Sequence, residues 1–114
     1  MSDCIICRVI AGKLPGTIVF EDDRVVAFKD INPQAPTHIL VAPRRHIESL
    51  NDLSAGDDEI VGGMIRRAAA LAKEQGFAER GYRTVFNTNR DGGQTISHIH
   101  LHLLGGRRLT WPPG

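Results

Sequence analysis

The chain is poor in the features that mark secreted or membrane proteins. It has only two cysteines, Cys4 and Cys7, in 114 residues, and they stand too close together to cross-link a fold. No apolar run approaches the ~20 residues needed to cross a bilayer. The first residues place no basic segment before a short apolar one, as a signal peptide would. We therefore expect a cytoplasmic protein without a membrane partner.

The chain also lacks an excess of charge of either sign. Lys and Arg together number 14 and Asp and Glu 13, for a net charge of +1, and both signs are spread along the sequence. Binding to a nucleic-acid backbone needs a clustered basic face. The pairs Arg44–Arg45 and Arg66–Arg67 are more typical of solvated surface. We expect no nucleic-acid partner.

What remains is the composition of an ordinary globular domain, with 41% hydrophobic and 24% charged residues. No repeat, linker or low-complexity segment divides the chain, so we expect one domain over residues 1–114, a length just sufficient for one core. The pattern predicts an α+β fold, an antiparallel sheet with one long helix against a face. The expected elements are a short helix over 4–12, strands over 17–23, 24–30 and 38–43, a loop over 31–37, a long helix over 57–75, a strand over 82–88, a turn over 89–94 and a strand over 96–104.

Caps and breakers set the expected helix ends. Asp3 is a candidate N-cap for the short helix, Ser54 for the long one, and Gly76 ends the latter. The pair Gly62–Gly63 weakens the long helix by roughly 1 kcal/mol per glycine relative to alanine, unless it permits close packing.

The last predicted strand carries three of the five histidines, at alternate positions: His98, His100 and His102. Side chains alternate across a strand, so these rings share one face and lie about 6.6 Å apart along it. The apolar residues between them, which would pack under the long helix, are Ile99, Leu101 and Leu103.

Three interpretations of this face stand open. The rings could simply fill a half-exposed sheet surface. They could bind a catalytic metal, because imidazole is a common zinc ligand. They could also form a phosphate site, where a neutral imidazole is the nucleophile and a neighbour donates to phosphate oxygens.

The segment 98–104 resembles the His-φ-His-φ-His-φ-φ signature of the histidine-triad (HIT) nucleotide-binding family. Segments 20–47, 89–107 and 111–114 also resemble its Hint branch, the purine nucleoside phosphoramidases. The resemblance implies a five-stranded antiparallel sheet with one long and one short helix. It further implies a homodimer in which two sheets join edge to edge and the C-terminal segment with Trp111 reaches the partner's site.

The resemblance also implies roles for the histidines and their neighbours. His100 would attack the α-phosphorus of a purine nucleoside 5′-phosphoramidate or an acyl-nucleotide, forming a nucleotidyl-histidine that water hydrolyses. His102 would contact the phosphate and help supply protons. Thr95, where many relatives have serine, would donate to the phosphate and leaving group. Asn87 and the backbone amide of Gly93 would contact the phosphate.

For the nucleoside, the resemblance gives Asp30 the two ribose hydroxyls, although a turn residue before Asn32–Pro33 is the alternative. His38 matches a recurrent family histidine behind the site, or is only a strand-end histidine. The apolar slot for the purine would consist of residues that otherwise look like core: Ile5, Ile6, Val9, Phe28, Ile31 and Leu40.

The Cys4-x-x-Cys7 pair indicates either two reduced cysteines on a short helix, a redox pair or half of a zinc site. It resembles microbial HIT proteins in which two cysteines, a distant histidine and the first triad histidine hold a structural zinc. Here those histidines would be His46 and His98. Two thiolates and two imidazoles make a closed tetrahedral set, so the expected cofactor is a structural Zn²⁺, with none needed for the chemistry.

The leading hypothesis is a homodimeric phosphoramidase that acts through His100 on a purine nucleotide of the AMP or GMP class. A nucleotide-binding adaptor with incidental turnover is the second, and a metallohydrolase with zinc on the triad is the third. The sequence names neither the leaving group nor the preferred purine.

Overall fold

The structure is a computed structural model that describes residues 3–114. Met1 and Ser2, at the start of the domain expected over 1–114, lie outside the described residues. The helices and strands are α1 (Ile5–Ile10), β1 (Ile18–Glu21), β2 (Val25–Lys29), β3 (Thr37–Pro43), α2 (Asp58–Glu74), β4 (Arg83–Phe86), α3 (Asn89–Gly92) and β5 (Leu101–Gly105). The strands form one antiparallel sheet in the order β1-β2-β3-β5-β4. This confirms the predicted α+β fold with its five-stranded sheet, one long helix and a short N-terminal helix.

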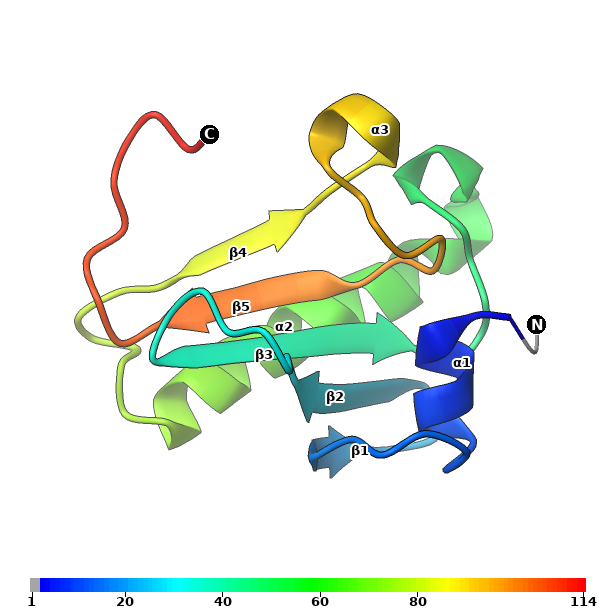
Figure 1. Cartoon of the computed structure of the whole chain (residues 1–114), viewed down its shortest axis with the longest axis horizontal. Coiled ribbons are helices and arrows are strands. Elements are labelled where there is room, and N and C mark those ends of the chain that lie inside the picture. Colours follow the sequence, from blue (N-terminus) through cyan, green and yellow to red (C-terminus); the bar gives the residue numbers. More distant parts are fainter. Residues whose placement is uncertain (1–2) are drawn as a thin grey trace.

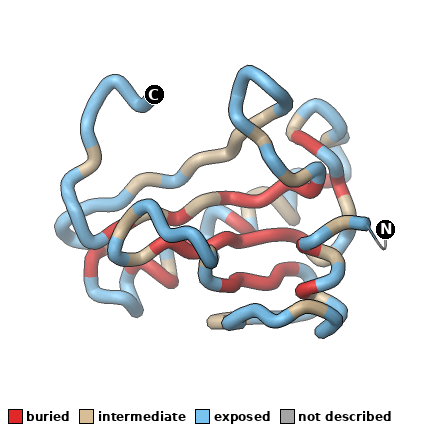
Figure 2. Tube along the Cα trace, in the orientation of Figure 1, coloured by how far each residue is buried: buried red, intermediate tan, exposed pale blue. Residues whose placement is uncertain are grey.

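The two faces of the sheet are covered differently. Helix α2 packs behind the strands, whereas α1 and the loop 30–36 lie on the opposite face (Figure 1). Buried residues are concentrated in the central strands β2, β3 and β5 (Figure 2). The core on the α2 side contains Ile39, Met64, Leu71, Leu101 and Leu103 among others. The smaller core under α1 consists of Ile6, Val9, Val26, Phe28, Leu40 and Ala42.

Helix α2 begins later than its expected cap. Ser54 instead starts a short 3₁₀ turn, Ala55–Asp57, and α2 follows with Asp57 as its N-cap residue. The predicted stop is confirmed in that Gly76, just past the end of α2, has φ of +88°, a value that glycine adopts at little cost. A Cβ added at Gly62 or Gly63 would meet nothing within 4 Å, so close packing does not require either glycine.

Both predicted ends of the short helix were wrong by one or two residues. The N-cap of α1 is Cys4 rather than Asp3, because the Cys4 Sγ accepts the N–H of Cys7 at 3.3 Å. The helix ends at Ile10, before Gly12. The turn expected over 89–94 contains the single helical turn α3, closed by Gly93 in the left-handed region.

The histidine strand is shorter than predicted. Strand β5 begins at Leu101, not at residue 96, since the N–H of His98 folds back to the carbonyl oxygen of Ile96 at 2.9 Å. The N–H of Ile99 bonds to the carbonyl oxygen of Ile47 at 2.7 Å, which keeps this segment against the chain after β3. The apolar side chains still alternate as predicted, because Ile99, Leu101 and Leu103 all join the core on the α2 side.

Across residues 3–114, the structure contains no helix with both the length and the apolar character required to cross a membrane.

Candidate active site

A cavity of about 580 Å³ opens on the sheet face opposite α2, between α1 and the loop 30–36. It brings together most of the residues that the sequence predicted for the site. Those lining it are Ile5, Ile6, Val9, Phe28, Asp30, Ile31, Leu40, Thr95, His100 and His102, with His38. The cavity is therefore apolar at the end under α1 and carries imidazoles and one carboxylate at the other.

The apolar lining is divided between core and rim. Ile6, Val9, Phe28 and Leu40 are buried in the cluster under α1. Ile5 is 51% exposed and Ile31 is 95% exposed, so these two form the rim. An apolar slot with an open rim fits a flat heteroaromatic ring that enters from solvent.

Two predicted phosphate contacts lie outside this lining. Asn87 follows β4 and is half-buried, beside the turn of α3. Gly93 ends α3 with φ of +82°, and its N–H donates to the carbonyl oxygen of Arg90 at 3.1 Å. That conformation favours glycine, but a phosphate at this amide would have to share it with Arg90.

The ring of His100 is buried and held by a backbone acceptor. Its Nδ1 lies 2.7 Å from the carbonyl oxygen of His98. A carbonyl oxygen only accepts, so the ring proton sits on Nδ1 and the lone pair on Nε2. In the neutral imidazole, the nitrogen with the lone pair is therefore Nε2, on a ring that lines the cavity.

His102 lies beside His100, with ring centroids 4.9 Å apart, and beside His38, whose Nε2 is 2.9 Å from the His102 Nδ1. Burial lowers the pKa of His102 to about 4, helped by the neighbouring His100 and His38 rings. Burial likewise lowers the pKa of His38, although the Asp30 carboxylate, 3.4 Å from its Nε2, opposes that shift. Both rings are therefore neutral near pH 7.

The cysteine pair meets two histidines next to the cavity. The donor atoms of Cys4, Cys7, His46 and His98 all lie within 4.8 Å of one another. The Nδ1 of His98 is 3.4 Å from the Cys4 Sγ and 3.5 Å from the Cys7 Sγ, and the Nδ1 of His46 is 3.4 Å from the Cys7 Sγ. Sulfur and nitrogen ligands at usual zinc distances in a tetrahedron are separated by about 3.5 Å. The four donors therefore fit a tetrahedral zinc ion.

The tautomer of His98 suits the same role. Its Nε2 lies 2.8 Å from the carbonyl oxygen of Pro43, so that nitrogen carries the proton and Nδ1 presents its lone pair to the thiols. Burial raises the pKa of the Cys7 thiol, and the adjacent Cys4 adds to the rise. Repulsion disfavours two thiolates this close together, and a cation between them would stabilise the charged pair.

The triad does not form one ligand set. Within residues 3–114, the clusters of three or more potential metal ligands are the Cys4–Cys7–His46–His98 group and an Asp30–His38–His102 group. His100 belongs to neither. This separation argues against a single metal held by all three triad histidines.

Sequence reasoning missed several residues of the cavity. Leu14 lines its apolar end, and its position just after the short helix was the available signal. Gln34 lines the other end and contacts His38 through its backbone N–H at 3.0 Å. Because the backbone makes that contact, no side-chain type in the sequence predicts it.

Comparison with known proteins places this geometry in a family. The HIT domain family model matches residues 11–109. The chain belongs to the HIT domain family. It is 51% identical over 107 residues to the purine nucleoside phosphoramidase of Escherichia coli, covering 94% of this chain and 90% of the relative.

Solved structures agree on the fold. A HIT family hydrolase from Legionella pneumophila superposes with a TM-score of 0.97 at 52% identity, covering 98% of this chain and 100% of the other. A zinc-bound histidine triad family protein from Mycobacterium smegmatis superposes with a TM-score of 0.80 at 32% identity, covering 93% of this chain and 76% of the other.

Proposed function

We propose that the protein hydrolyses purine nucleoside 5′-phosphoramidates through a covalent intermediate on His100. It is an enzyme of the HIT type, in keeping with its hydrolase relatives. The observation that carries the proposal is the 2.7 Å contact of the His100 Nδ1 with the carbonyl oxygen of His98. That contact leaves the Nε2 lone pair as the nucleophile, in a cavity of nucleotide size.

The proposed reaction has two displacements at phosphorus. The Nε2 of His100 attacks the α-phosphorus, a new P–N bond forms, and the bond to the leaving amine breaks as that amine gains a proton. Water then attacks the nucleotidyl-histidine, which releases the mononucleotide and restores the neutral ring. His102 would hold phosphate oxygens and help supply protons, and the Thr95 hydroxyl would donate to the phosphate and the leaving group.

The substrate's nucleoside would lie along the rest of the cavity. Asp30 would accept from both ribose hydroxyls, because a carboxylate offers two acceptor oxygens. The purine would stack among the apolar side chains under α1. Asn87 and Gly93 remain proposed phosphate contacts from the α3 side.

We also propose that Cys4, Cys7, His46 and His98 hold a structural Zn²⁺. The support is the spacing of their donor atoms and the tautomer of His98. When bound, the metal would join α1 to the segment before β5, and the residues around it would take no part in bond breaking. The homodimer and the cytoplasmic location expected from the sequence stay predictions.

Incubation with adenosine 5′-phosphoramidate or AMP-lysine tests the function. We expect release of AMP, trapping of a nucleotidylated protein by a denaturing quench at alkaline pH, where a P–N bond to histidine survives, and loss of at least about 10³-fold in kcat for His100→Ala. AMP titration of that variant, with binding retained, shows that the cavity is intact. Full activity in His100→Ala would overturn the mechanism, and tight AMP binding without turnover in the wild type would favour an adaptor.

A further inference from the structure

A line of hydrogen bonds runs from the loop before β3 into the cavity. The backbone N–H of Gln34 donates to the Nδ1 of His38 at 3.0 Å. The other ring nitrogen of His38, Nε2, lies 2.9 Å from the Nδ1 of His102. His38 is 7% exposed, so water does not compete freely for either contact.

These contacts allow only one placement of the protons. A backbone N–H can only donate, so the Nδ1 of His38 accepts and its proton is on Nε2. That Nε2–H then donates to His102, whose Nδ1 must accept. A neutral His102 consequently carries its own proton on Nε2, the nitrogen left free to donate within the cavity.

The surroundings of His102 support this neutral form. The titratable groups that face it are Asp30, His38 and His100. The residues opposite it on the neighbouring strands, Leu40 of β3 and Val85 of β4, carry no charge. The Asp30 carboxylate is 3.4 Å from the His38 Nε2 without forming a hydrogen bond to it, so the shorter contact to His102 decides where that N–H points.

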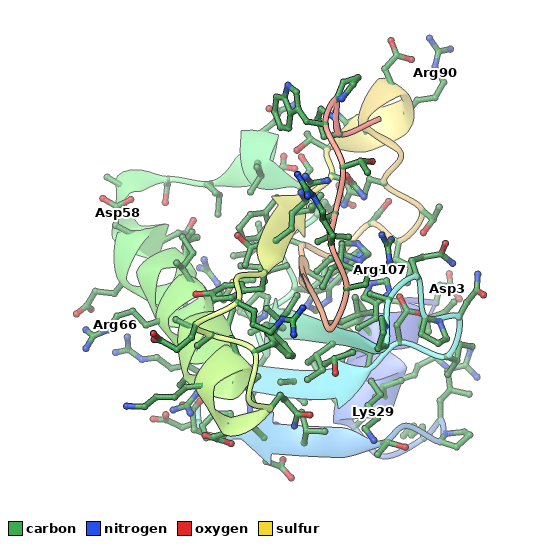
Figure 3. All side chains as sticks on the ribbon, turned by 90° about the vertical axis from the view of Figure 1, so that its left-hand side faces the viewer. Asp3, Lys29, Asp58, Arg66, Arg90 and Arg107 are labelled. Carbon is green, nitrogen blue, oxygen red and sulfur yellow. The ribbon has the colours of Figure 1, made fainter. Side chains whose placement is uncertain are left out.

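The loop 30–36, which contains Gln34, is held by an arginine from the C-terminal segment. The Nε and Nη2 of Arg107 donate to the carbonyl oxygen of Gln34 at 3.2 and 2.9 Å. Arg107 is exposed and lies on the segment after β5, next to the loop (Figure 3). A forked guanidinium contact of this kind fixes both the position and the direction of the carbonyl it holds.

We propose that Gln34, through its backbone amide, and Arg107, through Gln34, are positioning residues that hold His102 in the tautomer that donates to the substrate's phosphate. His38 connects the two, because it accepts from the N–H of Gln34 and donates to the Nδ1 of His102. The proposal rests on the proposed function for its catalytic meaning, since only a phosphate at His102 makes that donor useful. The assignment of the tautomer itself stands on the contacts alone.

A matched pair of variants at His38 tests the direction in which these hydrogen bonds donate. The amide of His38→Gln can still donate to the His102 Nδ1, whereas the carboxylate of His38→Glu can only accept. We expect the Gln variant to stay within about tenfold of wild-type kcat, and the Glu variant to fall by about 100-fold at pH 8, the usual loss for one positioned donor. Protonation of His102 restores the N–H at its Nε2. The kcat of the Glu variant should therefore recover as pH falls towards 6. A merely structural role predicts equal losses with the same pH profile.

Arg107 has a natural control in its neighbour. Arg107→Ala should lower kcat by about tenfold through a loosened loop, with the affinity for AMP changed less. Arg108→Ala, which removes an exposed arginine side chain outside this line of bonds, should match the wild type. Equal kcat in the two alanine variants would remove Arg107 from the proposal.

The tautomer can be read without any turnover. Two-bond ¹H–¹⁵N spectra of ¹⁵N-histidine-labelled protein should show His102 protonated at Nε2 in the wild type and the Gln variant, and at Nδ1 in the Glu variant. A wild-type His102 protonated at Nδ1 would overturn the inference even if phosphoramidates are hydrolysed. If the wild type gives the expected spectra but releases no AMP, the proposed function is wrong and the tautomer assignment still holds.

Discussion

The Nδ1 of His100 lies 2.7 Å from the carbonyl oxygen of His98, so the backbone of a proposed metal ligand orients the proposed nucleophile. The ring of His98 is itself fixed between the Pro43 carbonyl oxygen and the two thiols. The ring and the carbonyl group of His98 belong to one residue. Contacts that fix the ring in the cysteine–histidine cluster therefore also help to fix the carbonyl oxygen that accepts from His100.

Removing the metal should for this reason weaken both the fold and the reaction. We expect a strong chelator, applied to the metal-loaded protein near pH 7.5, to lower the Tm and kcat together, and added Zn²⁺ to restore both. Cys4→Ser should reproduce the loss, because a serine hydroxyl is a poor zinc ligand at this pH. Metal analysis, calorimetry and AMP release on the same samples provide the measurement. Loss of kcat with an unchanged Tm would instead support a catalytic metal.

Acid should destabilise the protein through the cavity histidines. Burial lowers the pKa of His102 to about 4, from an ordinary value of 6.5, and lowers that of His38 as well. Below pH 6.5 the unfolded chain therefore binds more protons than the folded one. The stability that the neutral rings contribute is complete above pH 6.5 and is lost as pH falls towards 4. Urea midpoints measured across this range should fall with pH.

The variant His102→Asn separates the contribution of His102 to this pH dependence of the urea midpoint. The variant keeps a side-chain acceptor for the His38 N–H but cannot be protonated, so its midpoints should fall less steeply between pH 6.5 and 4. Acid release of any metal from the cysteine cluster is common to both proteins and cancels in the comparison. Parallel profiles would show that His102 does not titrate differently on unfolding.

The sequence predicted the parts of this site that depend on side-chain type and period. Alternation placed Ile99, Leu101 and Leu103 in the core under α2 and left His100 and His102 on the face that lines the cavity. It could not show that residues 96–100 leave the strand, because that bend comes from backbone contacts to Ile47 and Ile96. The N–H of Gln34 was invisible for the same reason. Backbone partners are chosen by the tertiary fold, which no local pattern records.

Two glycines should respond oppositely to alanine. Gly63 is exposed within α2, and a Cβ there would meet nothing within 4 Å. Gly63→Ala should therefore raise the free energy of unfolding by about 1 kcal/mol, from helix propensity alone. A Cβ at Gly105 would collide with the ring of Phe77, so Gly105→Ala should be destabilising by about 1–3 kcal/mol. Denaturant melts of both variants beside the wild type check the signs, and a destabilising Gly63→Ala would reveal a packing partner on that helix face.

Asp30 can be tested as a ribose ligand by the ratio of two substrates. Its Oδ1 accepts the N–H of Asn32 at 2.9 Å, so Asp30→Asn keeps the size of the side chain and an oxygen for that turn, but loses the negative charge and one acceptor. Hydrogen bonds to a charged group contribute about 1.5–3 kcal/mol, so the wild type should prefer adenosine over 2′,3′-dideoxyadenosine phosphoramidate by about 10- to 100-fold in kcat/KM. In Asp30→Asn that preference should shrink towards a few-fold, whereas Asp23→Asn, an exposed carboxylate in the β1–β2 turn, should retain it. Because each variant serves as its own reference, damage to His38 or His102 affects both substrates and leaves the ratio unaltered. A ratio that is the same in all three proteins would reduce Asp30 to the turn residue of the alternative interpretation.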